Sequence, residues 1–87
     1  MFKPKKLKYH SYFLTSVIVR RPYLTEERIL NVLQHFESRE IQENGRIALH
    51  GYDLEAKKFL KVIIEIENGE EYIFNAFLDR SYKGKRK

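Results

Sequence analysis

The chain has 87 residues, 43% of them hydrophobic, which is enough for one folded domain but not for two. It contains no cysteine, which excludes disulfides and thiolate-bound metal and gives no sign of an oxidising compartment. The formal net charge of +5 points towards anionic partners, such as a nucleic acid or an acidic protein.

The positive charge lies at the two ends of the chain. Residues 1–10 hold four lysines and residues 80–87 hold five basic side chains, whereas residues 11–79 carry eight basic against twelve acidic side chains. We therefore expect a basic N-terminal tail over 1–10, one domain over 11–79 and a basic C-terminal tail over 80–87. The tails are either solvated ends that aid solubility or a clamp on a polyanion or an acidic partner.

The first predicted element is a strand over residues 12–20, which are rich in β-branched and aromatic side chains and apolar on both alternating faces. Pro22 ends it, because proline has no N–H to give to a sheet. The apolar run from Tyr12 to Val19 is shorter than the ~20 residues that span a bilayer, and no signal-peptide cleavage site follows it. We therefore expect a cytoplasmic protein that does not enter a membrane.

An amphipathic helix is predicted next. Thr25 is a good N-cap, and two glutamates follow it where the helix dipole favours negative charge. The apolar stripe has helical spacing and consists of Ile29, Val32, Leu33 and Phe36.

Two hairpins follow. Residues 39–42 and 46–52 flank Asn44-Gly45, and a three-residue loop with a left-handed Gly45 puts Ile41 opposite Ile47. Residues 58–67 and 71–78 flank the type I′ turn signal Asn68-Gly69, and a two-residue loop pairs Ile64 with Ile73, Leu60 with Phe77 and Val62 with Asn75. Because both faces of the second hairpin are apolar, we expect it in the centre of the sheet.

The predicted fold class is therefore α+β, with a single amphipathic helix packed on a five-stranded, mostly antiparallel sheet in the order β-α-β-β-β-β. The helix covers one face of this sheet, so the other face remains available for function.

Arg46, His50 and Tyr52 are predicted to share one side of their strand. They offer a fixed cation, a group that titrates near neutral pH and a phenol, which are the parts needed for cleaving RNA by attack of its 2′-OH. The alternative is structural: Arg46 closes a turn, His50 is a surface residue and Tyr52 packs beside Gly51.

Several other polar residues are candidates for binding RNA. Lys61 and Asn75 interrupt apolar strands, and each either reaches a binding site or serves the fold through snorkelling or a hydrogen bond. Arg80, Tyr82 and Lys83 alternate basic and aromatic character, which suits stacking on a base beside a phosphate, but they equally fit an ordinary tail. His10, His35 and His50 lack the spacing of metal ligands, and no cofactor motif is present, so we expect neither metal nor cofactor.

From Arg20 to Lys83 the chain carries the run RRPYLTEERI…VL…RE.QENGRI…GY…FLKV…ENGE…NAFLDRSYK. In this run it resembles small bacterial proteins of the BrnT-type branch of the RelE-like toxins. The resemblance implies a small basic α+β domain that cuts RNA without a metal, usually with a pair of helices before the sheet or a helix after it. It also implies an acidic antitoxin protein as partner.

The first functional hypothesis is therefore a metal-independent endoribonuclease toxin of a toxin–antitoxin pair. His50 transfers protons, Tyr52 stacks or acts as a second acid or base, and Arg46 and Arg80 stabilise phosphate charge. The residues expected to bind RNA are Lys61, Asn75, Tyr82, Lys83, Lys85 and Arg86. Two alternatives stay open: a nucleic-acid-binding module without catalysis, and a protein-interaction domain that uses an exposed edge strand at 39–42.

Overall fold

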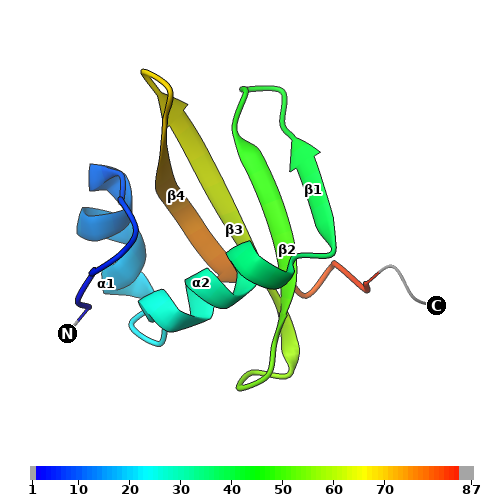
Figure 1. The fold of residues 1–87 in the computed structure, drawn as a ribbon. Coiled ribbons are helices and arrows are strands. Elements are labelled where there is room, and N and C mark those ends of the chain that lie inside the picture. The colour runs from blue at the N-terminus through cyan, green and yellow to red at the C-terminus, as the bar shows by residue number, and fades with distance from the viewer. Residues whose placement is uncertain (1, 85–87) are drawn as a thin grey trace.

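The computed structural model describes residues 2–84, which form two helices followed by a four-stranded antiparallel sheet (Figure 1). The predicted α+β class is confirmed, but the predicted five strands and single helix are wrong. No helix in this part of the chain is long and apolar enough to cross a lipid bilayer.

The predicted first strand is a helix over residues 11–20, formed by the π-helical segment η1 (Phe13–Val17) and the last turn α1 (Ile18–Arg20). Phe13 and Val17 are fully buried, and their spacing of four residues puts them on one side of a helix. Leu14 and Val19 lie outside the core and are 41% and 69% exposed. The apolar residues at alternating positions therefore belong to a helix that is apolar on several sides. The β-branched composition, from which a strand was predicted, was misleading.

His10 caps this first helix. Its carbonyl accepts the N–H of Phe13 at 2.9 Å, and its ring Nδ1 accepts the N–H of Tyr12 at 3.0 Å. Because Nδ1 is an acceptor here, the ring proton lies on Nε2, which is 3.7 Å from a carboxylate oxygen of Glu67. His10 thus serves the fold by satisfying N–H groups at the helix start.

The second helix, α2 (Glu26–His35), forms as predicted. The Thr25 hydroxyl accepts the N–H of Arg28 at 3.2 Å, which confirms the N-cap. Ile29 and Val32 are fully buried, whereas Phe36 follows the helix and is 41% exposed. A Cβ on Gly51 would lie 3.1 Å from the backbone of Val32, so the glycine allows α2 to approach the sheet closely.

The sheet has the order β1 (Ser38–Ile41), β2 (Ile47–Asp53), β3 (Lys58–Glu67), β4 (Glu70–Leu78), with every pair antiparallel. Ile41 lies opposite Ile47, and Gly45 has a φ of 89°, so the predicted register and loop of the first hairpin are confirmed. Asn68 and Gly69 have φ values of 53° and 81°, as a type I′ turn requires.

The second hairpin contains a bulge that the sequence did not predict. Ile64 pairs with Ile73 as expected, but the register shifts by one residue between Ile63 and Ile64. The predicted pairs Leu60–Phe77 and Val62–Asn75 are therefore wrong. The observed pairs are Leu60–Leu78, Val62–Ala76 and Ile63–Asn75. The extra residue in β4 turns Ala76 into the core and puts Phe77 on the opposite face.

The predicted central position of this hairpin is also wrong, because β4 is an edge of the sheet. Residues before the first helix lie beside it: Ile73 donates to the carbonyl of Lys8 at 2.8 Å and accepts from the N–H of His10 at 2.9 Å. The other edge is β1, where Ile41 is 65% exposed.

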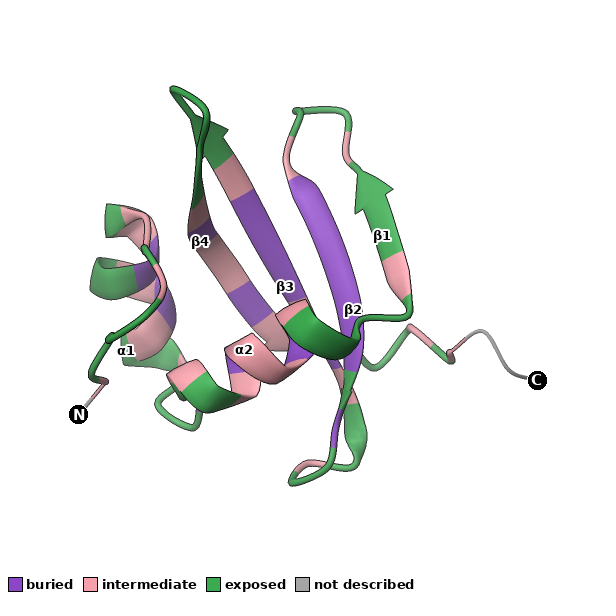
Figure 2. Ribbon diagram, viewed as in Figure 1, coloured by how far each residue is buried: buried purple, intermediate pink, exposed green. Residues whose placement is uncertain are grey.

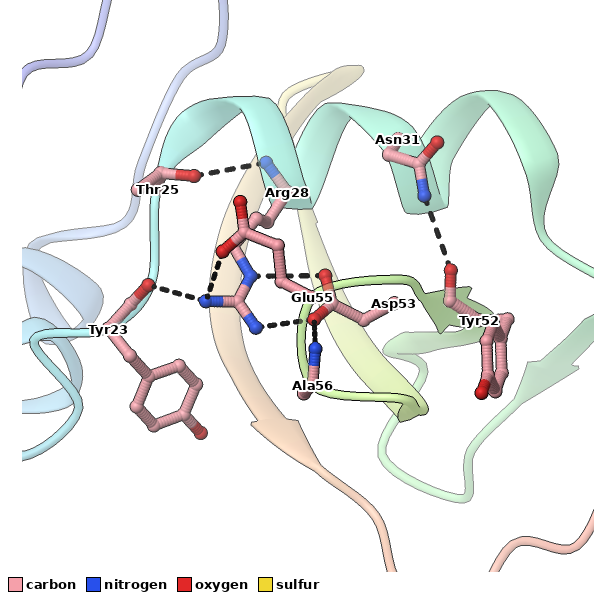
Figure 3. Close-up of polar contacts among 8 residues, drawn as sticks. All are labelled: Tyr23, Thr25, Arg28, Asn31, Tyr52, Asp53, Glu55 and Ala56. Carbon is pink, nitrogen blue, oxygen red and sulfur yellow. Dashed lines mark hydrogen bonds and ion pairs between the residues drawn. The ribbon is translucent and has the colours of Figure 1, made fainter.

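The core lies between the helices and one face of the sheet, and Figure 2 shows the buried residues concentrated in β2 and β3. An ion pair between Arg28 of α2 and Asp53 at the end of β2 holds the helix on this face (Figure 3). Asp53 also accepts the N–H of Ala56 at 2.9 Å, so the same carboxylate fixes the loop between β2 and β3.

Candidate nucleic-acid interface

The face of the sheet opposite α2 is called the open face below. Along β2, Leu49, Gly51 and Asp53 contact the core or α2, so the alternate residues His50 and Tyr52 point the other way. The open face is formed by Arg46, His50 and Tyr52 on or beside β2, Phe59 and Lys61 on β3, and Phe74, Asn75 and Phe77 on β4. Titratable and aromatic side chains thus share one face, which α2 does not cover and which the first helix reaches at Phe74 through Tyr12.

One cluster on this face is built on Phe74. The Arg46 guanidinium lies 3.7 Å from the centre of the Phe74 ring, and its Nε donates to Glu65. Tyr12, from the start of the first helix, stacks on Phe74 with 4.9 Å between ring centres and 21° between planes. Arg46 is therefore fixed by a carboxylate and a ring, with its remaining guanidinium donors available to a ligand.

A second cluster is built on Phe77. Lys61 Nζ lies 5.6 Å from the centre of this ring, and the Arg21 guanidinium lies 5.7 Å from it. Lys61 comes from the middle of β3, whereas Arg21 follows the last turn of the first helix. Two cations from distant parts of the sequence therefore share one ring.

The third cluster contains His50, which is only 5% exposed. Its Nε2 lies 2.9 Å from Oδ2 of Asp79, so Nε2 carries the proton, and Nδ1 is buried without a hydrogen-bond partner within residues 2–84. Hydrogen bonds from His50 and Ser81 hold the pKa of Asp79 at about 2, although burial acts in the opposite direction.

Tyr82 covers His50. The two rings stack with 4.0 Å between centres and 10° between planes, and Tyr82 also meets Phe59 edge-on at 4.9 Å. Its hydroxyl donates to Glu37 at 2.9 Å, and partial burial with this hydrogen bond raises the pKa of the phenol. The segment 79–84 therefore lies along the open face and occupies the space above His50.

The structure brings together most of the residues predicted for the site. Arg46, His50 and Tyr52 do share one side of β2, and Lys61 lies directly beside His50 on β3. Tyr52 is 45% exposed and meets Phe59 edge-on at 5.3 Å.

The remaining predicted residues are less closely tied to these clusters. The Asn75 side-chain oxygen accepts the N–H of Ala76 at 2.8 Å beside the bulge, which gives this residue a role in the fold. Arg80 and Lys83 are exposed, and Lys85 and Arg86 lie outside the described residues.

Sequence reasoning missed Arg21, Phe74, Phe77 and Asp79. Phe77 was assigned to the wrong face because the bulge was not predicted. Asp79 was the last residue of the predicted domain 11–79 and was given no role in a site. The mispredicted strand over residues 12–20 hid the route by which Arg21 reaches Phe77. No pattern in the sequence connects Asp79 with His50, which lies 29 residues earlier.

One cavity lies away from the open face. It has a volume of about 700 Å³ and lies between the N-terminal segment, the first helix and the start of α2. Its lining is mainly apolar, from residues such as Leu14, Ile18 and Val19, with Lys3 and Lys5 beside them.

Across the described residues, no three His, Asp or Glu side chains come together as a metal site requires. Comparison of the chain with protein-family models, with curated proteins and with solved structures found no match.

Proposed function

We propose that the protein binds single-stranded RNA on the open face of its sheet. The observation that carries this proposal is that two cations lie over aromatic rings: Arg46 over Phe74 and Lys61 over Phe77. Such pairs offer flat surfaces for stacking of bases next to positive charge for phosphates. A protein–protein interface does not need this regular alternation of rings and cations, whereas a nucleic-acid strand repeats the same two chemical groups at every nucleotide.

Tyr82 shows that this face accepts a stacked aromatic group. Its ring lies nearly parallel to the His50 imidazole at 4.0 Å, which is the geometry that a nucleobase adopts on an aromatic side chain. Bases of a bound strand would stack on the partly exposed rings nearby, and the segment 79–84 would form one wall of the binding surface.

The binding test compares two charge-removing variants on opposite faces of the sheet. Lys61→Gln removes a cation from the open face, whereas Arg39→Gln removes an exposed cation from β1, where its side chain points to the face that carries α2. Affinity for a labelled single-stranded RNA, about ten nucleotides long, is measured by fluorescence anisotropy between about 50 and 200 mM salt. Lys61→Gln should weaken binding and Arg39→Gln should not. Equal losses in both variants, or no binding by the natural protein, would contradict the proposal.

A second candidate function is the metal-independent cleavage of RNA, and the His50–Asp79 pair favours it. A carboxylate that holds one imidazole nitrogen fixes the tautomer and leaves the other nitrogen as a base, as in other acid–base sites. The presence of two helices before a four-stranded meander also agrees with what the resemblance to RelE-like toxins implies.

In this reaction, His50 Nδ1 takes the proton of the 2′-OH, whose oxygen attacks the adjacent phosphorus. The bond to the 5′-oxygen breaks, and that oxygen receives a proton from Tyr52 or water, which leaves a 2′,3′-cyclic phosphate. Arg80, which directly follows Asp79, would stabilise the charge on the phosphorus centre. Arg46 lies four residues from His50 along the strand, about 13 Å away, and would bind a neighbouring phosphate of the RNA instead. Tyr82 must first leave His50, because the stacked phenol covers the ring.

The cleavage test uses the purified protein and a single-stranded RNA in the presence of EDTA. His50→Ala should abolish cleavage, and His35→Ala, which changes an exposed histidine on α2, should leave it unchanged. Intact RNA with the natural protein would leave binding as the sole function of this face. Full cleavage by His50→Ala would exclude His50 as the base.

The resemblance also implies an acidic protein partner, and we propose the apolar groove beside the first helix as its binding site. Lys3 and Lys5 at its edge supply charge complementary to an acidic segment, and Val19 is 69% exposed there. Val19→Glu should prevent co-purification with an acidic protein encoded by the neighbouring gene, while RNA binding stays unchanged. Co-purification that survives this substitution would place the partner elsewhere.

A further inference from the structure

We infer that Arg21 and Lys61 form a phosphate-binding subsite around Phe77 on the open face. The inference rests on the proposed RNA binding and names the place where one backbone phosphate of the strand is held. Arg21 contributes from the end of the first helix and Lys61 from the middle of β3.

The backbone of Arg21 is fixed on both sides. Its N–H donates to Val17 at 2.9 Å, and its carbonyl accepts from Leu24 at 3.1 Å, so the residue is anchored between the two helices. Its Nη1 is buried and has no hydrogen-bond partner within residues 2–84. Since Nη1 is closed off from solvent but the side chain as a whole is only half-buried, an anionic ligand would bind the guanidinium through its other donors and balance its charge.

Arg21 and Lys61 differ from the other half-buried cations of the described region in their ion pairing. Four Lys and Arg side chains of the described region are half-buried: Arg21, Arg28, Arg46 and Lys61. Arg28 pairs with Asp53 and Arg46 pairs with Glu65, whereas no carboxylate of the described region pairs with Arg21 or Lys61. The two cations that lack a carboxylate are the two that share the Phe77 ring.

Two carboxylates of the open face, Asp79 and Glu65, are already engaged. Asp79, two residues after Phe77, accepts from His50 with one oxygen and from the Ser81 N–H and hydroxyl with the other. Glu65, on the same strand as Lys61, is held by Arg46. Within residues 2–84, no carboxylate therefore compensates the positive charge around Phe77, which favours an anion from outside.

A phosphate group fits this setting better than a carboxylate ligand. Its several oxygens accept from a guanidinium and an ammonium at once, and the planar guanidinium suits phosphate geometry. A phosphodiester also brings a base, which would stack on the partly exposed Phe77 ring, whereas inorganic phosphate would occupy the cations alone.

The test has two arms, which separate free phosphate from an RNA backbone. In the first, inorganic phosphate is titrated into isotope-labelled protein at constant ionic strength while NMR follows the side-chain signals of Arg21 and Lys61. Both signals should shift and saturate, and the signal of Arg39 should not. Unchanged Arg21 and Lys61 signals would overturn the inference.

In the second arm, the salt dependence of RNA affinity is measured for Arg21→Gln, Lys61→Gln and the control Arg39→Gln. The slope of log affinity against log salt should fall by about 0.7 for each of the first two and stay unchanged for the control. Arg21→Lys keeps the charge and should keep the slope, and thermal melts check that each variant is folded. Unchanged slopes in Arg21→Gln and Lys61→Gln would overturn the subsite while RNA binding stands. Phosphate binding without any RNA binding would support the subsite and contradict the proposed function.

Discussion

At the scale of single residues, the Arg28–Asp53 ion pair makes the sharpest stability prediction. The side chains are only 13% and 4% exposed, and Asp53 also caps the loop after β2 (Figure 3). Asp53→Ala leaves the Arg28 charge buried without its partner and should lower the free energy of unfolding by about 3–5 kcal/mol. Urea unfolding followed by circular dichroism measures this change.

Glu55 provides the matched control, because it also forms an ion pair with Arg28, with 3.4 Å between the charged atoms, but its side chain is 77% exposed. Glu55→Ala should change stability by no more than about 0.5 kcal/mol, as expected for a surface pair. Similar losses in the two variants would show that burial does not decide the strength of these contacts.

Asp79 makes a prediction about acid stability. Its pKa of about 2 lies below the ordinary 3.8, because His50 and Ser81 stabilise the carboxylate in the folded protein. Its contribution is therefore complete above pH 3.8 and is lost as the pH falls through about 2. Over this range the natural protein should lose stability more steeply than Asp79→Asn. Parallel pH profiles would show that the His50–Asp79 contact does not stabilise the fold.

At the scale of elements, Glu26 ties the N-terminal segment to the start of α2. Its carboxylate accepts the N–H groups of Lys5 and Leu7, each at 2.9 Å, and the hydroxyl of Tyr9 at 3.0 Å. Burial acts to raise the pKa of Glu26, but these hydrogen bonds outweigh it and lower the pKa. Below the ordinary pKa of a glutamate, the attachment should weaken as the carboxylate gains a proton.

Glu26→Gln should therefore speed hydrogen exchange at the amides of Lys5 and Leu7 while the exchange of β2 and β3 stays unchanged. Glu27→Gln, at the next position of α2, is the control and should leave both regions as they are. Slow exchange that persists in Glu26→Gln would mean that packing of Phe2 and Leu7 holds the segment instead.

The elements differ in how far their sequences predict them. The hairpin turns were predictable because glycine and asparagine adopt left-handed conformations easily, as Gly45, Asn68 and Gly69 do here. The helix α2 was predictable from its cap and apolar stripe. The first helix was not, because its β-branched residues favour a strand locally and only the burial of Phe13 and Val17 decides for a helix. The bulge in β4 was not predicted for a similar reason. Phe74 and Phe77 are apolar and fit the strand pattern on either face of the sheet, so the pattern does not reveal the shift in register.

The candidate site, like the elements, could be predicted from the sequence only in part. Alternation along β2 was enough to put Arg46, His50 and Tyr52 on one face, because that strand has no bulge. The residues that define the clusters, Arg21, Phe77 and Asp79, come from segments whose positions depend on the mispredicted helix, the bulge and the path of the C-terminal segment. These residues reach the open face only through the tertiary fold.

At the scale of the whole molecule, the two faces of the sheet have different tasks. One face is covered by the helices and forms the core, whereas the other carries rings, cations and the His50–Asp79 pair. The ends of the described chain add to this asymmetry, since Tyr82 of the segment 79–84 lies on the open face and Lys3 and Lys5 lie beside the apolar groove. RNA and a protein partner would thus use separate surfaces.

The most direct test of RNA binding on the open face is NMR mapping with a short single-stranded RNA, about ten nucleotides long. We predict that signals of Arg46, Lys61, Phe74 and Phe77 shift, while those of α2 and of the exposed β1 residue Arg39 do not. Shifts confined to α2 or to β1, or no shifts at any concentration of RNA, would contradict the account.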